Sequence, residues 1–174
     1  MKHFTFAAAF RALYDKAVAS YSRGQRGAAS LFSPAETAFL AANGISTQHL
    51  YDYAEDFAQE GMPDFGTAIG IELVRRDYFL NVQHGRPSPL VLDSAGLPSR
   101  GATLHGIAWL PRLLPKARAK LRGELAPSLM YSCGGDRTFF QAHDIHPAEF
   151  LSVVWRSPDD DAVAAWVAAR TAAK

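Results

Sequence analysis

The sequence has a single cysteine among its 174 residues, and it lacks long apolar runs and any excess of charge of one sign. A lone thiol cannot form a disulfide within the chain, which indicates a reducing compartment. No stretch approaches the roughly 18 apolar residues of a membrane-spanning helix, and the N-terminal apolar run is too short for a signal peptide. Because the formal net charge is only +1, no overall field attracts nucleic acid. We therefore expect a cytoplasmic protein whose partners include neither membrane nor nucleic acid.

Sequence motifs of the common cofactor sites are also absent. The chain contains no Gly-x-Gly-x-x-Gly, no phosphate-binding loop of the Walker type and no Gly-x-Ser-x-Gly. A zinc site would have to combine Cys133 with His143, His146 and His105, but these residues lack the paired spacing of known zinc ligands. We therefore expect no cofactor and no metal.

Helix signals dominate the first half of the chain. The apolar spacing over residues 5–23 is that of one helix face, and the glycines that follow are typical of a helix end. Ser33 and Glu36 have the spacing of a capping box that opens a second helix, and Ser46 is positioned to cap a third.

The fourth helix is expected over residues 64–83, where two separate lines of apolar residues run along the segment. A helix that is apolar on two sides is central to a fold or meets another subunit, so this helix is our candidate for homo-oligomerisation. Its β-branched residues leave two short strands, IGIELV and YFLNVQ, as the competing interpretation.

The second half repeats this plan after a stretch rich in proline and glycine. Residues 85–103 are interpreted as a linker between a helical half at 1–84 and another at 104–174. A helix begins near Leu110, and Pro115 suggests that this entry consists of two short pieces. Further helices are predicted to begin at Gly134, at His146-Pro147 and at Ser157-Pro158-Asp159.

A shift of one hundred residues superimposes the two halves without a gap. The shift pairs Leu13 with Leu113 and Lys16 with Lys116, and the helix starts at Ser33 and Ser46 fall on Cys133 and His146. We interpret this as an internal duplication. The predicted fold is therefore all-α, with two similar four-helix halves packed into one globular unit.

The second half carries a specific run of motifs: LHGIAWLPRLLPKARAKLRG, YSCGGDRTFF, DIHPAEFL and DDDAVAAWV. In this order they resemble an uncharacterised bacterial family catalogued as domain of unknown function number 5069. The resemblance covers roughly residues 104–167, and the first half looks like a divergent copy in which Ser33 replaces Cys133. The resemblance implies a fold and no activity.

Cys133 is the sharpest chemical candidate, because it precedes the helix predicted at Gly134. At an N-cap its thiol faces unpaired backbone N–H groups, an environment that favours the thiolate. Gly134 and Gly135 leave the backbone bare, so that an anionic ligand can approach the same donors. Asp136 could orient His105 and so complete a Cys–His pair. The alternative is that Cys133 is a small buried cap.

Several basic residues are expected near this helix start: Arg112, Lys116, Arg118 and Arg137. Lys116 and Asp136, matched by Lys16 and Glu36, form either an anion or acid–base site or an ion pair that fixes one helix against the next. The basic helix face could meet phosphate or RNA, but without interleaved aromatic residues a solvated face is the simpler interpretation.

These observations predict a small binding or interaction module rather than an enzyme, with an anionic ligand held by Gly134, Gly135 and the basic residues around them. Two alternatives stay open. The first is a cysteine-dependent enzyme or redox sensor that uses Cys133, with Asp136 and His105 as its partners. The second is a structural protein that associates through the 64–83 helix.

Overall fold

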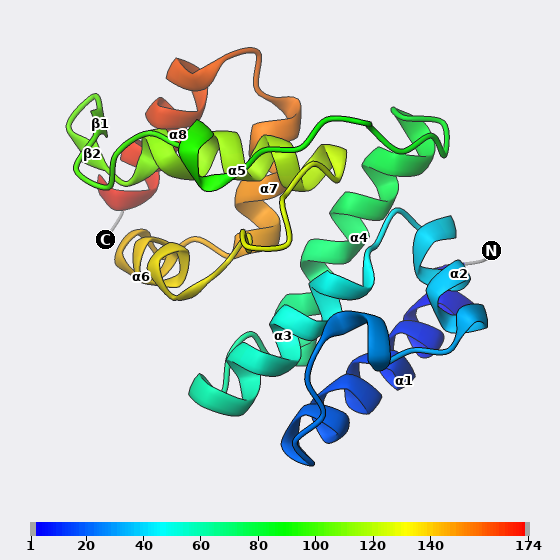
Figure 1. Ribbon diagram of the computed structural model, residues 1–174. Coiled ribbons are helices and arrows are strands. Elements are labelled where there is room, and N and C mark those ends of the chain that lie inside the picture. The colour runs from blue at the N-terminus through cyan, green and yellow to red at the C-terminus, as the bar shows by residue number, and fades with distance from the viewer. Residues whose placement is uncertain (1–2, 173–174) are drawn as a thin grey trace. The chain divides into compact units, whose positions relative to one another are not determined.

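The computed structural model describes residues 3–172, and the chain divides into two compact units, Met1–Pro87 and Ser88–Lys174 (Figure 1). Across the described residues the secondary structure consists of eight α-helices, two one-turn 3-10 helices and a single two-stranded sheet. The predicted all-α class is therefore confirmed. No helix in the described part has both the length and the apolar character needed to cross a membrane.

The first unit contains four α-helices, and two of them begin at the cap residues predicted for them. The helices are α1 (His3–Ser22), α2 (Pro34–Ala42), α3 (Thr47–Glu60) and α4 (Phe65–Asn81), with the 3-10 helix η1 (Ala28–Ser30) between α1 and α2. Ser33 and Glu36 form the predicted capping box at the start of α2, and the hydroxyl of Ser46 accepts a hydrogen bond from the backbone of His49. These side chains satisfy N–H groups that the first helical turn leaves unpaired.

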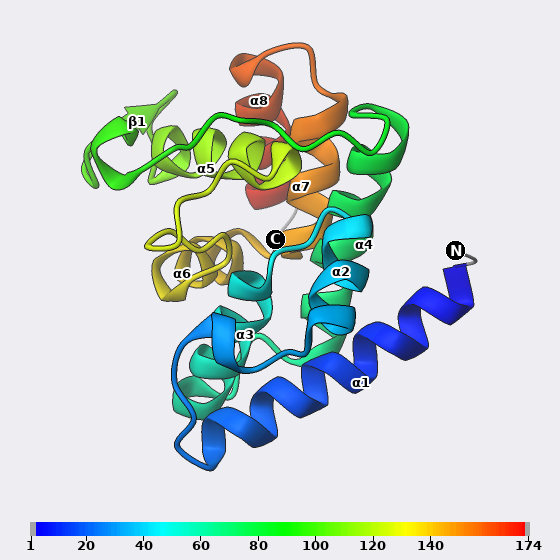
Figure 2. The same ribbon diagram turned by 45° about the vertical axis from the view of Figure 1, so that its right-hand side comes forward.

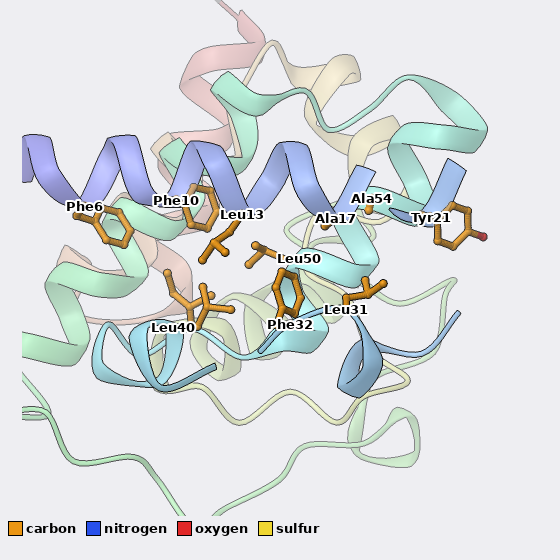
Figure 3. Close-up of a cluster of buried hydrophobic side chains, with 11 residues drawn as sticks. Phe6, Phe10, Leu13, Ala17, Tyr21, Leu31, Phe32, Leu40, Leu50 and Ala54 are labelled. Carbon is orange, nitrogen blue, oxygen red and sulfur yellow. The ribbon is translucent and has the colours of Figure 1, made fainter. Parts of the chain in front are cut away.

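The core of the first unit follows the apolar face of α1 (Figure 3). Phe6, Phe10 and Ala17 are fully buried on this face, and in the close-up the α1 side chains point toward Leu40 of α2 and Leu50 of α3. Because α1 packs along α3 and α4, the long N-terminal helix organises the whole unit. Burial of such side chains contributes about 1.5–3 kcal/mol each.

Within the segment 64–83, residues Phe65–Asn81 form one continuous helix, so the competing interpretation as two strands is wrong. The Asp64 carboxylate accepts a hydrogen bond from the backbone N–H of Thr67 across 2.8 Å and caps the helix. Ala68 and Ile71, which are fully buried, lie on a face with helical spacing. The β-branched residues are accommodated because tertiary packing outweighs their weak preference for strands. Association of two copies through α4 stays a prediction.

The second unit contains the other four α-helices and the small sheet (Figure 2). Its elements are η2 (Ser94–Gly96), β1 (Thr103–Leu104), β2 (Ile107–Ala108), α5 (Leu110–Arg122), α6 (Gly134–His143), α7 (Pro147–Arg156) and α8 (Asp160–Ala172). Helix α5 packs against α7 and β1, while α8 packs against α6 and α7. The antiparallel pair β1–β2 lies directly before α5. This strand pair was not predicted from the sequence.

Helix α5 is a single helix, although Pro115 lies inside it. The predicted division into two short pieces is therefore wrong. Pro115 removes one backbone hydrogen bond in the second turn, but Leu113 and Leu114, which immediately precede it, are almost completely buried. Their burial outweighs the loss and holds the helix in one piece.

The segment predicted as a linker is attached to the second unit. The backbone N–H of Leu92 donates to the carbonyl of Glu124 across 2.6 Å, and the N–H of Ala126 donates to the carbonyl of Leu92 across 2.9 Å. The hydroxyl of Ser88 donates to the Glu124 carboxylate across 2.7 Å. Residues 88–103 therefore form part of this unit.

The two units share local geometry at positions one hundred residues apart. Helices α2 and α6 begin at residues 34 and 134, and α3 and α7 begin at residues 47 and 147. Between them, Ile45 and Ile145 are both buried and both donate their backbone N–H to a carbonyl five residues earlier. The internal duplication that these parallels suggest stays a prediction.

Candidate functional site

The start of α6 lies at Gly134, as predicted, with Cys133 at the N-cap. The half-buried thiol of Cys133 makes no hydrogen bond to the helix backbone. Instead, Nζ of Lys116 lies 3.3 Å from its sulfur. Ser33, at the matching position of the first unit, does cap its helix through its hydroxyl. The two residues therefore share a position but make different contacts.

A buried carboxylate lies beside this thiol and accepts three hydrogen bonds. Asp136 is fully buried, and its Oδ2 lies 2.5 Å from Nζ of Lys116, which is itself only 3% exposed. The backbone N–H of Ser132 donates to the same oxygen across 2.9 Å, and the indole N–H of Trp109 donates to Oδ1 across 3.0 Å. This set of donors compensates a charge that would otherwise be costly to bury. The predicted ion pair between α5 and α6 is thus confirmed.

Tyr131 and Ser132, near the end of the loop before α6, are also buried and held by hydrogen bonds. Ser132 adopts a positive φ of 70°, and its carbonyl accepts a hydrogen bond from Arg137 across 2.8 Å. The Tyr131 hydroxyl donates to the carbonyl of Pro147. Burial, with a smaller contribution from the Asp136 charge, raises the pKa of Tyr131 well above its usual value. These contacts fix the backbone conformation at the start of α6.

Trp109 connects this buried cluster to the protein surface. It adopts the left-handed backbone conformation, with φ of 69°, between β2 and α5. Its ring lies so close to Gly135 that a Cβ atom at that position would be 2.6 Å from the indole. The absence of a side chain at Gly135 is therefore needed for the ring to pack against the first turn of α6. Trp109 itself is only partly buried.

An open pocket of about 730 Å³ lies next to Trp109 within the second unit. One wall is a single face of α6, and the others come from the hairpin region and the C-terminal turns of α8. The lining residues are Gly106, Ile107, Ala108, Trp109, Gly135, Thr138, Phe139, Ala142, His143, Ala168, Thr171 and Ala172. Such a volume and such apolar walls, with few polar groups, are typical of small-molecule sites.

Of the predicted ligand-binding residues, only Gly135 lines this pocket. Arg112 donates to the carbonyl of Pro98 across 2.8 Å, Arg118 forms an ion pair with Asp160, and Arg137 is held by the Ser132 carbonyl. Gly134 begins α6 beside the pocket without lining it. The structure therefore brings the helix start to the pocket but directs the basic side chains to other partners.

The basic face of α5 is only partly solvated: its lysines are buried, whereas the side chains of Arg118 and Arg122 are 32% and 42% exposed. Lys116 and Lys120 are 3% and 2% exposed. A lysine can be buried in this way only when its ammonium group has partners, and Lys116 has both Asp136 and the Cys133 sulfur.

The predicted pairing of Asp136 with His105 is wrong. His105 lies in the turn between β1 and β2, where its Nε2 is 2.8 Å from Oδ1 of Asp161 on α8. Both of these side chains are more than half exposed. Asp136 instead orients Trp109 and Lys116, so the Cys–His arrangement expected around Cys133 does not form.

The histidines considered for zinc have other roles. Nδ1 of His143 lies 2.6 Å from the hydroxyl of Thr171, and Nδ1 of His146 accepts a hydrogen bond from the backbone of Ala148 at the start of α7. Within residues 3–172, no group of three or more potential ligands is arranged to hold a metal ion.

The matching ion pair of the first unit also forms, but in a more exposed setting. Nζ of Lys16 lies 2.6 Å from Oε2 of Glu36, with the two side chains 40% and 28% exposed. The hydrogen bond from Lys16 is the main reason that the pKa of Glu36 lies below its usual value of 4.5, and the capping hydrogen bond from Ser33 adds to the effect.

The pocket was not predicted from the sequence. Phe139 was assigned no role in a site, and His143 was expected only as a zinc candidate. Together with Gly135, Thr138 and Ala142 these residues recur at intervals of three and four, which is the spacing of one helix face. That spacing was a usable signal, but it does not distinguish a pocket wall from a core face.

The pocket and the buried cluster both fall within the part of the chain that matches a known family. Residues 95–174 match the family model described as Domain of unknown function (DUF5069), which confirms the resemblance of the second half. A divergent copy in the first half stays a prediction. No curated protein and no solved structure matches the chain.

Proposed function

We propose a function from the pocket, because the family whose model residues 95–174 match is described without an activity: the protein is a non-enzymatic module that binds a small anionic ligand. The body of the ligand occupies the pocket beside Trp109. Its acidic group lies at the N-terminal end of α6.

One observation carries this proposal: Gly135 belongs both to the pocket wall and to the first turn of α6. The N–H groups of a first turn have no partners within the helix, and Cys133 does not supply one from its side chain. The positive end of the helix dipole adds to their attraction for an anion. A ligand in this pocket can therefore present a carboxylate or phosphate to these donors.

The neighbouring cations limit what kind of anion suits the site. Lys116 is paired with Asp136, and Arg118 with Asp160. The acidic group would therefore meet backbone donors rather than a free ammonium or guanidinium group. Backbone donors suit a singly charged carboxylate, held mainly through the apolar contacts of its body.

The test is a titration of the isotope-labelled full chain with cyclohexanecarboxylate and with the matched neutral amide, followed by NMR. We expect the acid to bind more tightly, with shifts at Gly135, Thr138 and the indole N–H of Trp109. Equal binding of the amide would contradict the anionic preference. The absence of shifts at these groups with either compound, and with phosphate and sulfate, would overturn the proposal.

A matched pair of variants on α8 locates the binding. Ala168→Gln places a larger neutral side chain in the pocket, whereas Ala165→Gln makes the same change at an exposed position one turn away that does not line it. We expect weaker binding only in the first variant. Equal affinities in both would place the ligand elsewhere.

The contact between Lys116 and Cys133 favours a second candidate, a cysteine-dependent enzyme or redox sensor. An ammonium group 3.3 Å from a sulfur stabilises a thiolate when one forms. This candidate predicts that Cys133 reacts with iodoacetamide at neutral pH faster than a free thiol does, and that Lys116→Met abolishes the difference. If Cys133 is alkylated only after unfolding, the candidate fails.

A further inference from the structure

We infer that the ligand of this pocket is a planar aromatic acid, recognised by ring side chains that the fold holds in fixed positions. The inference rests on the proposed binding function and names the chemical class of its ligand. It concerns the body of the ligand, whereas the proposed function concerns its acidic group.

Three of the side chains that line the pocket are rings: Trp109, Phe139 and His143. The rings of Phe139 and His143 contact each other, with their centroids 4.4 Å apart. Ring pairs in stacked or edge-on contact gain attraction beyond that of the area they bury. A ligand ring can make such contacts with this wall, and a saturated ligand of equal size cannot.

Trp109 is held from two directions. Its indole N–H is bonded to Asp136, a fully buried carboxylate that Lys116 and the backbone of Ser132 also hold. Its ring packs on the bare backbone of Gly135. A side chain fixed in this way loses little conformational entropy when a ligand binds.

His143 is also held in one orientation. The hydroxyl of Thr171 donates to the carbonyl of Val167 across 3.0 Å, so its only proton is used. Its oxygen must therefore accept the hydrogen bond of 2.6 Å from Nδ1 of His143. The ring that contacts Phe139 is thereby anchored to α8.

The remaining walls are made mostly of small side chains. Four alanines and a glycine lie opposite or beside the rings: Ala108, Ala142, Ala168, Ala172 and Gly106. These side chains cannot swing into the pocket to fill it, since none has a χ angle. Rigid rings with small residues around them suit a flat, inflexible ligand better than a long aliphatic chain, which would lose rotamer freedom on binding.

The experiment compares 2-naphthoate with its fully saturated counterpart, decahydro-2-naphthoate, by calorimetry and NMR on the full chain. The two acids carry the same charge and have similar size. We expect the aromatic acid to bind about three- to ten-fold more tightly, with ring-current shifts at the indole N–H of Trp109 and at Ala168. Equal affinities, or tighter binding of the saturated acid, would overturn the inference and leave the proposed function intact.

A neutral aromatic probe tests the anionic preference separately from the aromatic preference. If 2-naphthamide binds as tightly as 2-naphthoate, the proposed anionic preference fails, while the aromatic preference stands. If neither acid perturbs the pocket residues, both are overturned.

Variants of Trp109 provide the second measurement. Phe and Leu at this position lose the same hydrogen bond to Asp136 and share the same strained backbone, but only Phe keeps a ring. We expect Trp109→Phe to retain part of the preference for the aromatic acid, because it keeps a ring. We expect Trp109→Leu, which keeps no ring, to lower this preference further. An unchanged ratio of affinities in a folded Trp109→Leu protein would contradict the inference.

Discussion

Trp109 donates its indole N–H to Asp136 across 3.0 Å, and in this way a surface pocket is tied to a buried ion pair. The carboxylate uses Oδ1 for the indole and Oδ2 for Lys116. Any change that moves Asp136 must therefore be transmitted to the pocket wall. The ion pair therefore positions Trp109, and the first prediction below compares this pair with the matching one in the first unit.

Replacing Lys116 by Met removes the cation and leaves the buried Asp136 carboxylate with only the N–H groups of Ser132 and Trp109 as partners. Breaking a buried pair costs about 3–5 kcal/mol. Lys16→Met is the matched control, since its pair with Glu36 is partly exposed and an exposed pair contributes only about 0–1 kcal/mol. Urea unfolding of both variants measures the difference. Equal losses of unfolding free energy in the two variants would contradict the assignment of Lys116–Asp136 as the buried pair that determines position.

Gly135→Ala places a methyl group 2.6 Å from the Trp109 ring, so the ring or the helix start has to shift. We expect a loss of about 1–3 kcal/mol, as in other overpacked sites, and a shifted indole N–H resonance of Trp109. Gly101→Ala is the control, because nothing lies within 4 Å of its added Cβ. A Gly135→Ala protein with native stability and an unmoved indole resonance would refute the proposed fit of ring and backbone.

The stability contributed by Glu36 should depend on pH. The pKa of Glu36 is lowered in the folded state by its bonds to Lys16 and Ser33, so this stability is present above the usual pKa of 4.5 and is lost as the pH falls through the lowered folded value. We therefore expect Glu36→Gln to be less stable than the parent at neutral pH, with a difference that shrinks in acid. A difference in free energy of unfolding that stays constant across this range would contradict the prediction.

Tyr14 should keep its proton at unusually high pH. Burial, together with the nearby charges of Asp64 and Asp15, raises its pKa from 10.0 to about 12, and its hydroxyl donates to the buried carbonyl of Pro63 across 2.8 Å. The stability linked to this proton is complete below pH 10.0 and is lost as the pH rises toward about 12. Ultraviolet titration of the parent and of Tyr14→Phe would show whether the late-titrating phenol disappears with the substitution.

The same substitution also has an expected cost at neutral pH. Tyr14→Phe leaves the carbonyl of Pro63 without the hydroxyl that pairs with it, which costs about 1–3 kcal/mol for a buried group. Tyr51→Phe, at a partly buried tyrosine for which no such bond is seen, serves as the comparison. If thermal unfolding shows a smaller loss of stability for Tyr14→Phe than for Tyr51→Phe, this assignment of the hydrogen bond is contradicted.

Most of the helix starts could be predicted because their signals are local. The capping box of Ser33 and Glu36, and the caps at Ser46 and Asp64, depend only on residues within one turn. Cys133 and His146 were predicted by position and are N-caps as well. The contact between the Cys133 thiol and Lys116 could not be predicted from the local pattern, because Lys116 belongs to another helix.

The pocket could not be predicted because it depends on backbone conformations that the apolar spacing does not reveal. His105 and Gly106 both adopt positive φ, at 49° and 78°, which is the geometry of a two-residue hairpin turn. That turn and the left-handed Trp109 bring the indole ring to α6. The sequence contains one signal for this turn: the two residues His105-Gly106, which include a glycine, lie between the short segments that form β1 and β2.

The basic residues were predicted as a group but have separate partners in the structure. Arg112, Lys116 and Arg118 lie close together in the sequence, yet each contacts a different element. Charge patterning alone cannot distinguish a shared electrostatic field from separate pairings, because the partners come from distant parts of the chain. Such an assignment needs the tertiary structure.

The backbone bonds of Leu92 determine where the second unit can be cut. Removing residues 88–94 would leave the carbonyl of Glu124 and the N–H of Ala126 without their partners and would deprive the Glu124 carboxylate of the Ser88 hydroxyl. A fragment that starts at residue 95, where the family match begins, would therefore expose an unpaired edge, and unpaired edges promote aggregation. Expression of this domain by itself should start at Ser88 or earlier.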